Sequence, residues 1–92
     1  MEFEWNEAKA ESNKEKHGVS FEEAKTVFND KLFVDFHDPD HSNDEHRYII
    51  LGESVRCRLL MVSYTQRGNA VRLISARKAT QRERKAYEEE SL

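Results

Sequence analysis

The feature that most constrains the fold is a change in hydrophobic spacing near Asn29. Before this point, apolar residues recur every three or four positions, as on one face of a helix: Phe21, Ala24, Val27 and Phe28. After it they occupy alternate positions, as on one face of a strand: Leu32, Val34 and Phe36. We therefore expect helices packed on a mainly antiparallel sheet around one core, formed by Phe21, Val27, Phe28, Val34, Leu60 and Val62.

Capping residues and turn signals place the other elements. Alternating apolar and polar residues predict strands at 2–5 and 32–37, and three more strands follow at hairpin spacing at 47–52, 58–65 and 70–76. The run at 58–65 is apolar on both faces, which predicts a central strand. Side-chain caps at Asn6, Ser20 and Thr80 predict three helices, which cover residues 7–17, 21–29 and 81–90. This order predicts an α+β fold with a short N-terminal strand, two helices, an antiparallel sheet of about four strands and a C-terminal helix.

Length and composition indicate a single domain over residues 1–92. The charged fraction is 36%, but nine aromatic residues argue against a disordered chain. No apolar run is long enough to span a bilayer, and the acidic N-terminus is unlike a signal peptide. We therefore expect a cytoplasmic protein without a membrane partner. Cys57 is the only cysteine, which excludes an internal disulfide.

Charge is unevenly distributed along the chain. The nineteen residues from Arg67 to Lys85 carry seven basic side chains and one acidic one, whereas the first 66 residues carry eight and fourteen. Such a local positive field attracts phosphate even though the formal net charge is −3. Arginine dominates the cluster, and its planar guanidinium suits two-point contact with phosphate. The cluster therefore indicates a phosphate-binding site.

Arg72 and Arg77 are the strongest candidates within this cluster. Arg72 interrupts an apolar strand, where an arginine needs an anionic partner, either an internal carboxylate or an external phosphate. Arg77 stands where that strand ends, on a rigid support. Regular alternation puts the two side chains on opposite faces. Both serve one site only if the chain turns near Ser75 or Ala76.

The predicted C-terminal helix carries its charges in an unfavourable order. Arg82, Arg84 and Lys85 lie near its N-terminal end, and three glutamates lie near its C-terminal end. The helix dipole favours the reverse order by ~0.3–1 kcal/mol per charge. We expect contact with RNA or a partner to explain this layout; the alternative is that the three basic side chains only keep the surface soluble.

Other polar residues give weaker signals. The residue types that bind metals gather around one loop: His37, Asp38, Asp40 and His41. No regular spacing fixes them, so we expect no metal site. Glu45 and His46 precede a strand and are either proton-transfer groups or exposed loop residues. Asn13 and His17 lie four positions apart on the first helix, where His17 complements the C-terminal end of the dipole.

Three segments together resemble the BrnT family of toxins. They are FEWNEAKAESNKEKHGVSFEEAKTVFND, RLLMVSYTQRG and VRLISARKATQRERKAYEE, and the resemblance runs from Phe3 to Glu89. Polar residues at family positions are Arg47, Arg67, Arg72, Ser75, Arg77, Glu83 and Tyr87. Asn6 and His46 depart from the family, which usually has acidic residues there. Asn6 retains the helix cap, because asparagine and aspartate cap equally well.

The resemblance implies a type II toxin with a RelE-like fold that inhibits translation by cutting RNA without a metal or other cofactor. It also implies a BrnA-like ribbon-helix-helix antitoxin as partner. The toxin would then contact DNA only through this antitoxin. RNA, free or on the ribosome, is the implied substrate.

Metal-free cleavage of RNA uses the 2′-OH as nucleophile, a general base, a general acid and cations around the phosphorane. We predict these catalytic residues: Arg72, Arg77, Arg67, Arg47, Lys78 and Tyr64. We predict that Arg82, Arg84 and Lys85 bind RNA. Candidates for the acid and the base, ranked below the arginines, are Tyr64, Glu45, His46, Lys78 and Tyr87.

A second hypothesis is a non-catalytic module that binds nucleic acid or a partner and acts in autoregulation with the antitoxin. Both hypotheses predict an anion-binding surface. Only the first predicts RNA cleavage products.

Overall fold

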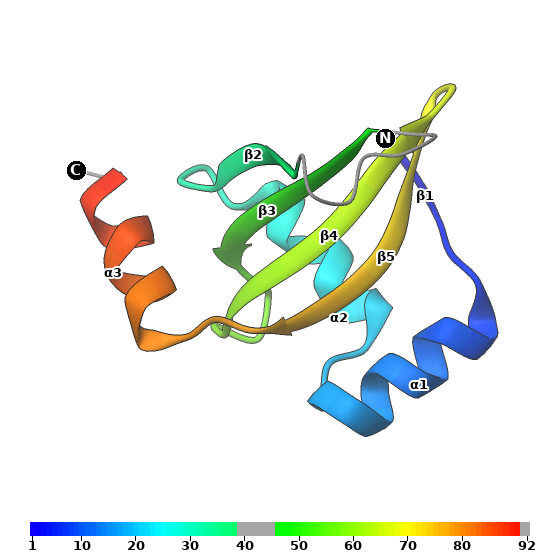
Figure 1. The fold of residues 1–92 in the computed structure, drawn as a ribbon, viewed down its shortest axis with the longest axis horizontal. Coiled ribbons are helices and arrows are strands. Elements are labelled where there is room, and N and C mark those ends of the chain that lie inside the picture. The colour runs from blue at the N-terminus through cyan, green and yellow to red at the C-terminus, as the bar shows by residue number, and fades with distance from the viewer. Residues whose placement is uncertain (39–45, 91–92) are drawn as a thin grey trace.

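The computed structural model describes residues 1–38 and 46–90. Its elements follow in the order β1 (Glu2–Glu4), α1 (Glu7–His17), α2 (Phe21–Ala24), the 3₁₀ helix η1 (Lys25–Asn29), β2 (Val34–Asp38), β3 (Arg47–Glu53), β4 (Leu59–Arg67), β5 (Ala70–Lys78) and α3 (Gln81–Glu90) (Figure 1). The predicted α+β architecture is confirmed. The helix expected at 21–29 is divided into one turn of α-helix and a 3₁₀ segment.

The five strands form one sheet in the order β1-β5-β4-β3-β2. Strands β2 to β5 pair with one another in antiparallel order, as predicted, and β1 adds to the far edge parallel to β5. Strand β4 lies in the middle of the sheet, as predicted (Figure 1). Its central place agrees with a sequence that is apolar on both faces.

Helix α2 and η1 cover one face of the sheet, which we call the helical face; it carries Ile50, Val62 and Leu73. Close packing there depends on Gly52, where a Cβ atom would lie 3.1 Å from the carbonyl oxygen of Val27. The buried cluster on this face is Val19, Phe21, Ala24, Val27, Ile50, Leu60, Val62, Tyr64, Val71, Leu73 and Ala76.

The predicted core is largely correct. Phe21, Val27, Leu60 and Val62 are fully buried, and Phe28 is partly buried against them. Val34 is an exception, because it pairs with Leu51 and so lies on the opposite face from Ile50. The prediction for Val34 was therefore wrong.

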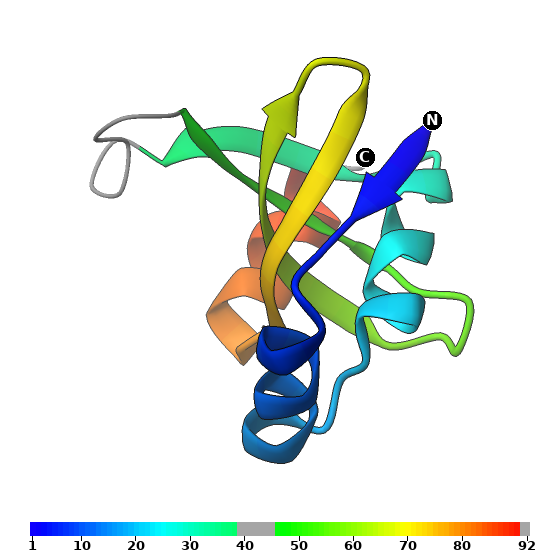
Figure 2. The same cartoon turned by 90° about the vertical axis from the view of Figure 1, so that its right-hand side faces the viewer.

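The opposite face of the sheet, which we call the open face, carries Leu51, Ser63 and Arg72. Helix α3 lies beyond the end of β5, on the side of the sheet away from α2 (Figure 2). None of its residues is buried. The Tyr87 hydroxyl joins it to Asp30 at the end of η1, donating to the carboxylate at 2.5 Å. None of the helices in the described residues is long and apolar enough to cross a membrane.

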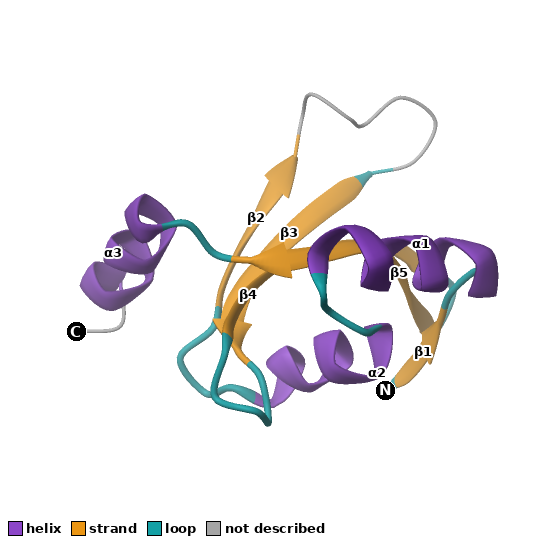
Figure 3. Ribbon diagram, turned by 90° about the horizontal axis from the view of Figure 1, so that it is seen from below, coloured by secondary structure: helices purple, strands orange, loops and turns teal. Residues whose placement is uncertain are grey.

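Helix α1 lies alongside β5, beyond the short strand β1 (Figure 3). Asn13, its one buried residue, pairs with the strand backbone: its amide nitrogen donates to the Ala76 carbonyl at 2.8 Å, and its oxygen accepts from the Ala76 N–H at 3.0 Å. The same amide donates to the Val19 carbonyl at 3.0 Å. Gly18 ends the helix with φ +68°, a conformation that favours glycine. Asn13 therefore fixes the C-terminal turn of α1 against β5.

Candidate functional site

A β-bulge brings Arg72 and Arg77 onto one face. Ser75 pairs with Ser63 and Leu73 pairs with Tyr64, so Ile74 has no partner in β4. The extra residue reverses the alternation of β5 at this point. Arg72 pairs with Thr65 and Arg77 pairs with Met61, two positions of β4 that share a face. Both arginines lie on the open face.

Four of the predicted arginines share this face. Arg47 pairs with Thr65 from the β3 side, and Arg67 lies two positions beyond Thr65 on β4. With Arg72 and Arg77, they form what we call the arginine face: Arg47, Arg67, Arg72 and Arg77. Because strands hold their side chains rigidly, four cations are presented in one direction from three neighbouring strands.

A pocket of about 240 Å³ opens on the same face. Its lining residues come from α1 and three strands: His17, Ile49, Met61, Ser63, Ser75, Ala76 and Arg77. Ser63 and Ser75 are paired across β4 and β5, so their two hydroxyl groups are neighbours. A cation, two hydroxyl donors and an imidazole therefore border one hollow of the sheet.

Arg77 is held by Glu83 at the start of α3. The two guanidinium nitrogens contact the two carboxylate oxygens, each at 2.8 Å. Glu83 also accepts from the Thr80 N–H at 2.8 Å and donates its own N–H to the Thr80 hydroxyl at 3.2 Å, so the predicted cap at Thr80 forms as a reciprocal capping box. The hydrogen bonds from Arg77 lower the pKa of Glu83 to about 2. The Glu83 carboxylate thus occupies the two nitrogen donors of the Arg77 guanidinium, a geometry that also suits a phosphate.

Arg72 has a carboxylate partner in β1. Its guanidinium lies 2.9 Å from the Glu4 carboxylate, and Glu4 is the residue that pairs with Arg72 in the parallel register. Glu4 is 41% exposed, so this pair is open to solvent and contributes only ~0–1 kcal/mol. The internal carboxylate considered from the sequence is therefore present, but it leaves the arginine accessible.

Tyr64 and Lys78 lie on the helical face, away from the four arginines. Tyr64 is buried against Phe28, with ring centroids 5.1 Å apart, and its hydroxyl donates to Asp35 at 3.3 Å. Burial raises the pKa of Tyr64 to about 12. Lys78 pairs with Leu60 and is exposed at the end of β5. The structure does not bring these two predicted residues to the pocket.

His46 belongs to an aromatic group on the helical face. Its imidazole lies 3.2 Å from that of His37, and His37 and Tyr64 each lie against Tyr48. Glu45, Asp40 and His41, which were proposed for proton transfer or considered as metal ligands, lie outside the described residues. Within the described ranges, no group of three His, Cys, Asp or Glu side chains is placed to hold a metal ion.

The predicted RNA-binding residues of α3 are exposed. Arg82, Arg84 and Lys85 border a hollow of about 380 Å³ together with Gln81 and Glu88. This basic surface belongs to the helix that Glu83 ties to Arg77. It is therefore connected to the arginine face through one ion pair.

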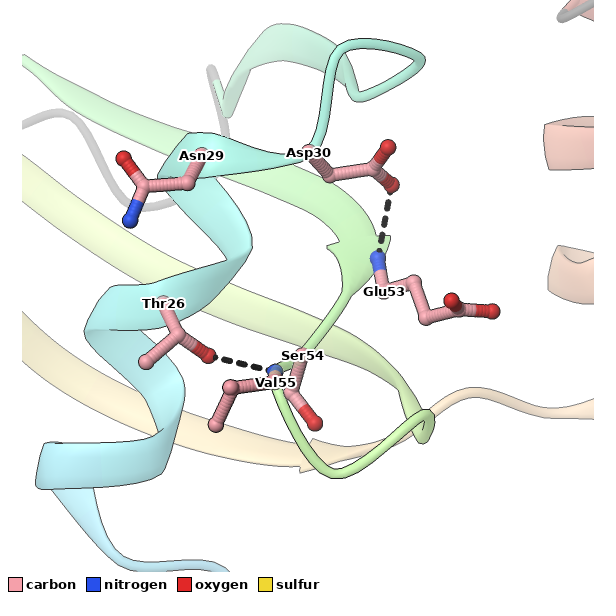
Figure 4. A pocket seen from close by; sticks show the side chains of 6 residues that line it. All are labelled: Thr26, Asn29, Asp30, Glu53, Ser54 and Val55. Atoms are coloured by element: carbon pink, nitrogen blue, oxygen red, sulfur yellow. Dashed lines mark hydrogen bonds between the residues drawn. The ribbon is translucent and has the colours of Figure 1, made fainter.

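A different pocket, of about 280 Å³, lies where η1 meets the turn after β3 (Figure 4). The Thr26 hydroxyl accepts from the Val55 N–H at 2.9 Å, and Asp30 accepts from the Glu53 N–H at 2.8 Å (Figure 4). Asp30 also accepts the Tyr87 hydroxyl. The carboxylates of Asp30 and Glu53 line this pocket and disfavour the binding of phosphate. Its hydrogen bonds instead fix the turn after β3 and attach α3 to the end of η1.

Two pocket residues were missed by reasoning from the sequence. Ser63 gave no signal, because a serine within an apolar strand does not reveal which face it occupies. His17 and Asn13 were recognised as helical neighbours, but the sequence does not show that Asn13 binds β5 and so places His17 beside Arg77. The spacing of four was the available signal.

Comparisons with known proteins agree with the resemblance noted in the sequence. The family described as ribonuclease toxin, BrnT, of type II toxin-antitoxin system matches residues 5–83. The crystal structure of the ribonuclease toxin BrnT from Brucella abortus superposes with a TM-score of 0.65 at 25% sequence identity. That match covers 88% of this chain and 99% of the other. A search of curated proteins found no match.

Proposed function

Because the chain belongs to the BrnT family of ribonuclease toxins of type II toxin–antitoxin systems, we propose that it cleaves RNA internally at the arginine face and thereby inhibits translation. Membership of a type II family implies an antitoxin partner. The finer proposals are that the cut requires no metal and that the partner is a BrnA-like ribbon-helix-helix protein. We place the reaction in the cytoplasm, with RNA as substrate either free or on the ribosome.

One observation carries the proposal: the bulge at Ile74 directs Arg72 and Arg77 toward the same side of the sheet, where Arg77 lines a pocket with two serine hydroxyls and Arg72 lies farther along β5. A phosphorane has more negative charge than the phosphodiester from which it forms. Preorganised cations and donors therefore stabilise the transition state more than the bound substrate. Arg47 and Arg67 extend the same positive face from the pocket toward the end of β4 and suit phosphates on that side of the cut.

The ion pair of Arg77 with Glu83 suggests how Arg77 binds RNA: the guanidinium exchanges the Glu83 carboxylate for a phosphate of the RNA. A phosphate oxygen pair replaces the carboxylate at the guanidinium fork, since both ligands accept two parallel hydrogen bonds. The basic residues of α3, Arg82, Arg84 and Lys85, then contact the RNA backbone outside the pocket.

The test is incubation of the purified toxin, free of antitoxin, with a defined RNA in the presence of EDTA. We expect discrete fragments with 5′-hydroxyl and 2′,3′-cyclic phosphate ends. The double variant Arg72→Ala/Arg77→Ala, purified in the same way, controls for contaminating ribonucleases. Cleavage that is equal in both samples, or that disappears in EDTA, contradicts the proposal.

The second hypothesis, a non-catalytic binding module, is favoured by one fact: both Arg72 and Arg77 have carboxylate partners. It predicts RNA binding without products. Measuring RNA affinity by fluorescence anisotropy on the same samples separates the two functions. Salt-sensitive binding with intact RNA supports the binding module, whereas binding followed by fragments supports the enzyme.

A further inference from the structure

We propose that His17 is the general base of the reaction, accepting the proton of the attacking 2′-hydroxyl group. This inference rests on the proposed ribonuclease function and assigns the role that the arginines cannot fill, because a guanidinium remains protonated throughout the neutral range. The assignment begins from the pocket on the open face, where His17 and Arg77 lie on its border with Ser63 and Ser75.

His17 has the appropriate chemistry for this position. Of the described side chains that line the pocket, it is the one whose residue type titrates near neutral pH. The others are apolar, hydroxyl-bearing or, at Arg77, a fixed cation. A phosphate bound by Arg77 and the two serines would place the adjacent ribose within the same hollow of about 240 Å³.

The backbone around His17 is fixed. Asn13, one helical turn earlier, is hydrogen-bonded to both backbone groups of Ala76, and positions four apart lie on the same side of a helix. The next residue, Gly18, ends α1, and its carbonyl accepts from the Arg58 guanidinium at 3.1 Å. Asn13 is therefore a positioning residue: it holds the last turn of α1 beside Ala76 and Arg77.

Glu23 reinforces this anchor from the following helix. Its carboxylate, 4% exposed, binds Arg58 and accepts the Ser54 hydroxyl at 2.7 Å. Hydrogen bonding to Arg58 lowers the pKa of Glu23, so the carboxylate remains charged. It thereby holds the Arg58 guanidinium that donates to the Gly18 carbonyl. The end of α1 is thus held from β5 on one side and from Arg58 on the other.

The other candidate proton acceptors lie elsewhere. Tyr64 and His46 belong to the helical face. Tyr87 donates its hydroxyl to Asp30, and burial raises its pKa to about 12. Among the described residues, His17 combines a suitable side chain with a place at the pocket that Arg77 lines.

The proposed step conserves atoms and charge. Neutral His17 takes the proton from the 2′-hydroxyl as the 2′-oxygen bonds to phosphorus, and the bond from phosphorus to the 5′-oxygen breaks. A water molecule protonates the departing 5′-oxygen, and the resulting hydroxide is neutralised by the proton held on His17. The products are a 2′,3′-cyclic phosphate and a 5′-hydroxyl end.

Charged groups from four parts of the chain lie near this histidine. Arg77 faces the pocket from β5, with Glu83 of α3 bound to it, and Arg58, just before β4, binds the adjacent Gly18. On α1 itself, Lys14 and Lys16 occupy the last turn. Arginine, lysine and glutamate are residue types whose ordinary pKa values lie outside the range of pH 5.5 to 8.5, so the comparison with the His17 variants assigns a change in rate across that range to the histidine.

The test compares His17→Gln and His17→Ala with wild type, using His37→Gln as a matched histidine control on the helical face. Single-turnover cleavage is measured from pH 5.5 to 8.5 on the full chain without antitoxin, and urea unfolding verifies that each variant is folded. We expect wild type and His37→Gln to show a rate that rises with pH and reaches a plateau. Both His17 variants should be about 100-fold slower or more and lack the rise. Added imidazole should accelerate His17→Ala but not Arg77→Ala.

Each alternative result has a distinct meaning. If wild type cleaves RNA and a folded His17→Gln variant cleaves at the same rate with the same pH dependence, His17 is not the base. A wild-type rate that falls as the pH rises, or a His17→Ala variant that imidazole does not accelerate, also overturns the assignment. If wild type yields no products at any pH, the proposed ribonuclease function fails and the assignment fails with it.

Discussion

Arg72 and Arg77 lie on the same face of the sheet although an odd number of positions separates them, because Ile74 has no partner in β4. Without this bulge, β5 would direct the two guanidinium groups to opposite sides. Bulges re-aim side chains next to functional sites in many proteins. Here the bulge produces a face that carries both cations, and one of them, Arg77, lines a pocket together with two serines.

Replacement of either arginine by alanine should slow RNA cleavage about 100- to 1000-fold, since each removes a cation that stabilises the transition state. Lysine should restore only part of the rate, because a point charge does not reproduce the guanidinium fork. Single-turnover rates under EDTA give the measurement. Lys78→Ala removes a cation from the helical face and is the matched control, expected to stay within about threefold of wild type.

Tyr64→Phe should leave the cleavage rate within about twofold of wild type, although Tyr64 was among the residues proposed from the sequence. Its hydroxyl donates to Asp35 on the helical face, and its pKa of about 12 leaves it protonated at neutral pH. Cleavage assays on the variant, with its urea midpoint as a control, test this. A loss of tenfold or more in a folded variant would return Tyr64 to the site.

The arrangement of elements was predictable because periodicity and capping are local. Asn6, Ser20 and Thr80 cap helices as expected, since each accepts a hydrogen bond from the backbone three residues later. The face of each arginine was not predictable, because it depends on the register between β4 and β5 and on a single unpaired residue. Alternation along β5 indicated opposite faces for Arg72 and Arg77. The observed register of β5 against β4, with Ile74 unpaired, places both on the same face.

The same limit explains His17 and Val34. The contact that places His17 at the pocket is made by Asn13 with Ala76, 63 positions away in the chain. Val34 was assigned to the core from its spacing, but spacing does not specify which face of an edge strand is covered by helices. Its partner Leu51 determines the face.

Glu83→Gln should lower the free energy of unfolding at neutral pH but not near pH 2. The pKa of Glu83 falls from 4.5 to about 2 on folding, so its ion pair contributes stability above pH 4.5 and loses it as the pH falls toward 2. We expect the difference in unfolding free energy between wild type and variant to be constant near neutral pH and to vanish near pH 2. Urea unfolding at several pH values measures it. A difference that persists unchanged at pH 2 would mean that the charge of Glu83 contributes nothing.

Asn13→Ala should cost about 2–4 kcal/mol of unfolding free energy, because it leaves the Ala76 N–H and the Ala76 and Val19 carbonyls without their partner. Urea denaturation measures the cost. Ser12→Ala, at an exposed neighbouring position on α1, should change the free energy by less than about 0.5 kcal/mol. If both variants are equally stable, Asn13 does not anchor α1.

Removal of residues 81–92 should change stability little while weakening RNA or antitoxin binding. The described part of α3 buries none of its residues and is held mainly by the pairs of Glu83 with Arg77 and of Tyr87 with Asp30. We expect a loss of about 1.5–2.5 kcal/mol in unfolding free energy, from ~0–1 kcal/mol for the partly exposed ion pair and ~1.5 kcal/mol for the hydrogen bond to a charged group. Its basic residues, Arg82, Arg84 and Lys85, are exposed and stand at the helix end where the dipole disfavours cations, so an outside ligand is the better reason for them. Unfolding curves and RNA anisotropy titrations on the truncated and full-length chains decide the matter. A loss of several kcal/mol with unchanged binding would show that α3 serves the fold instead.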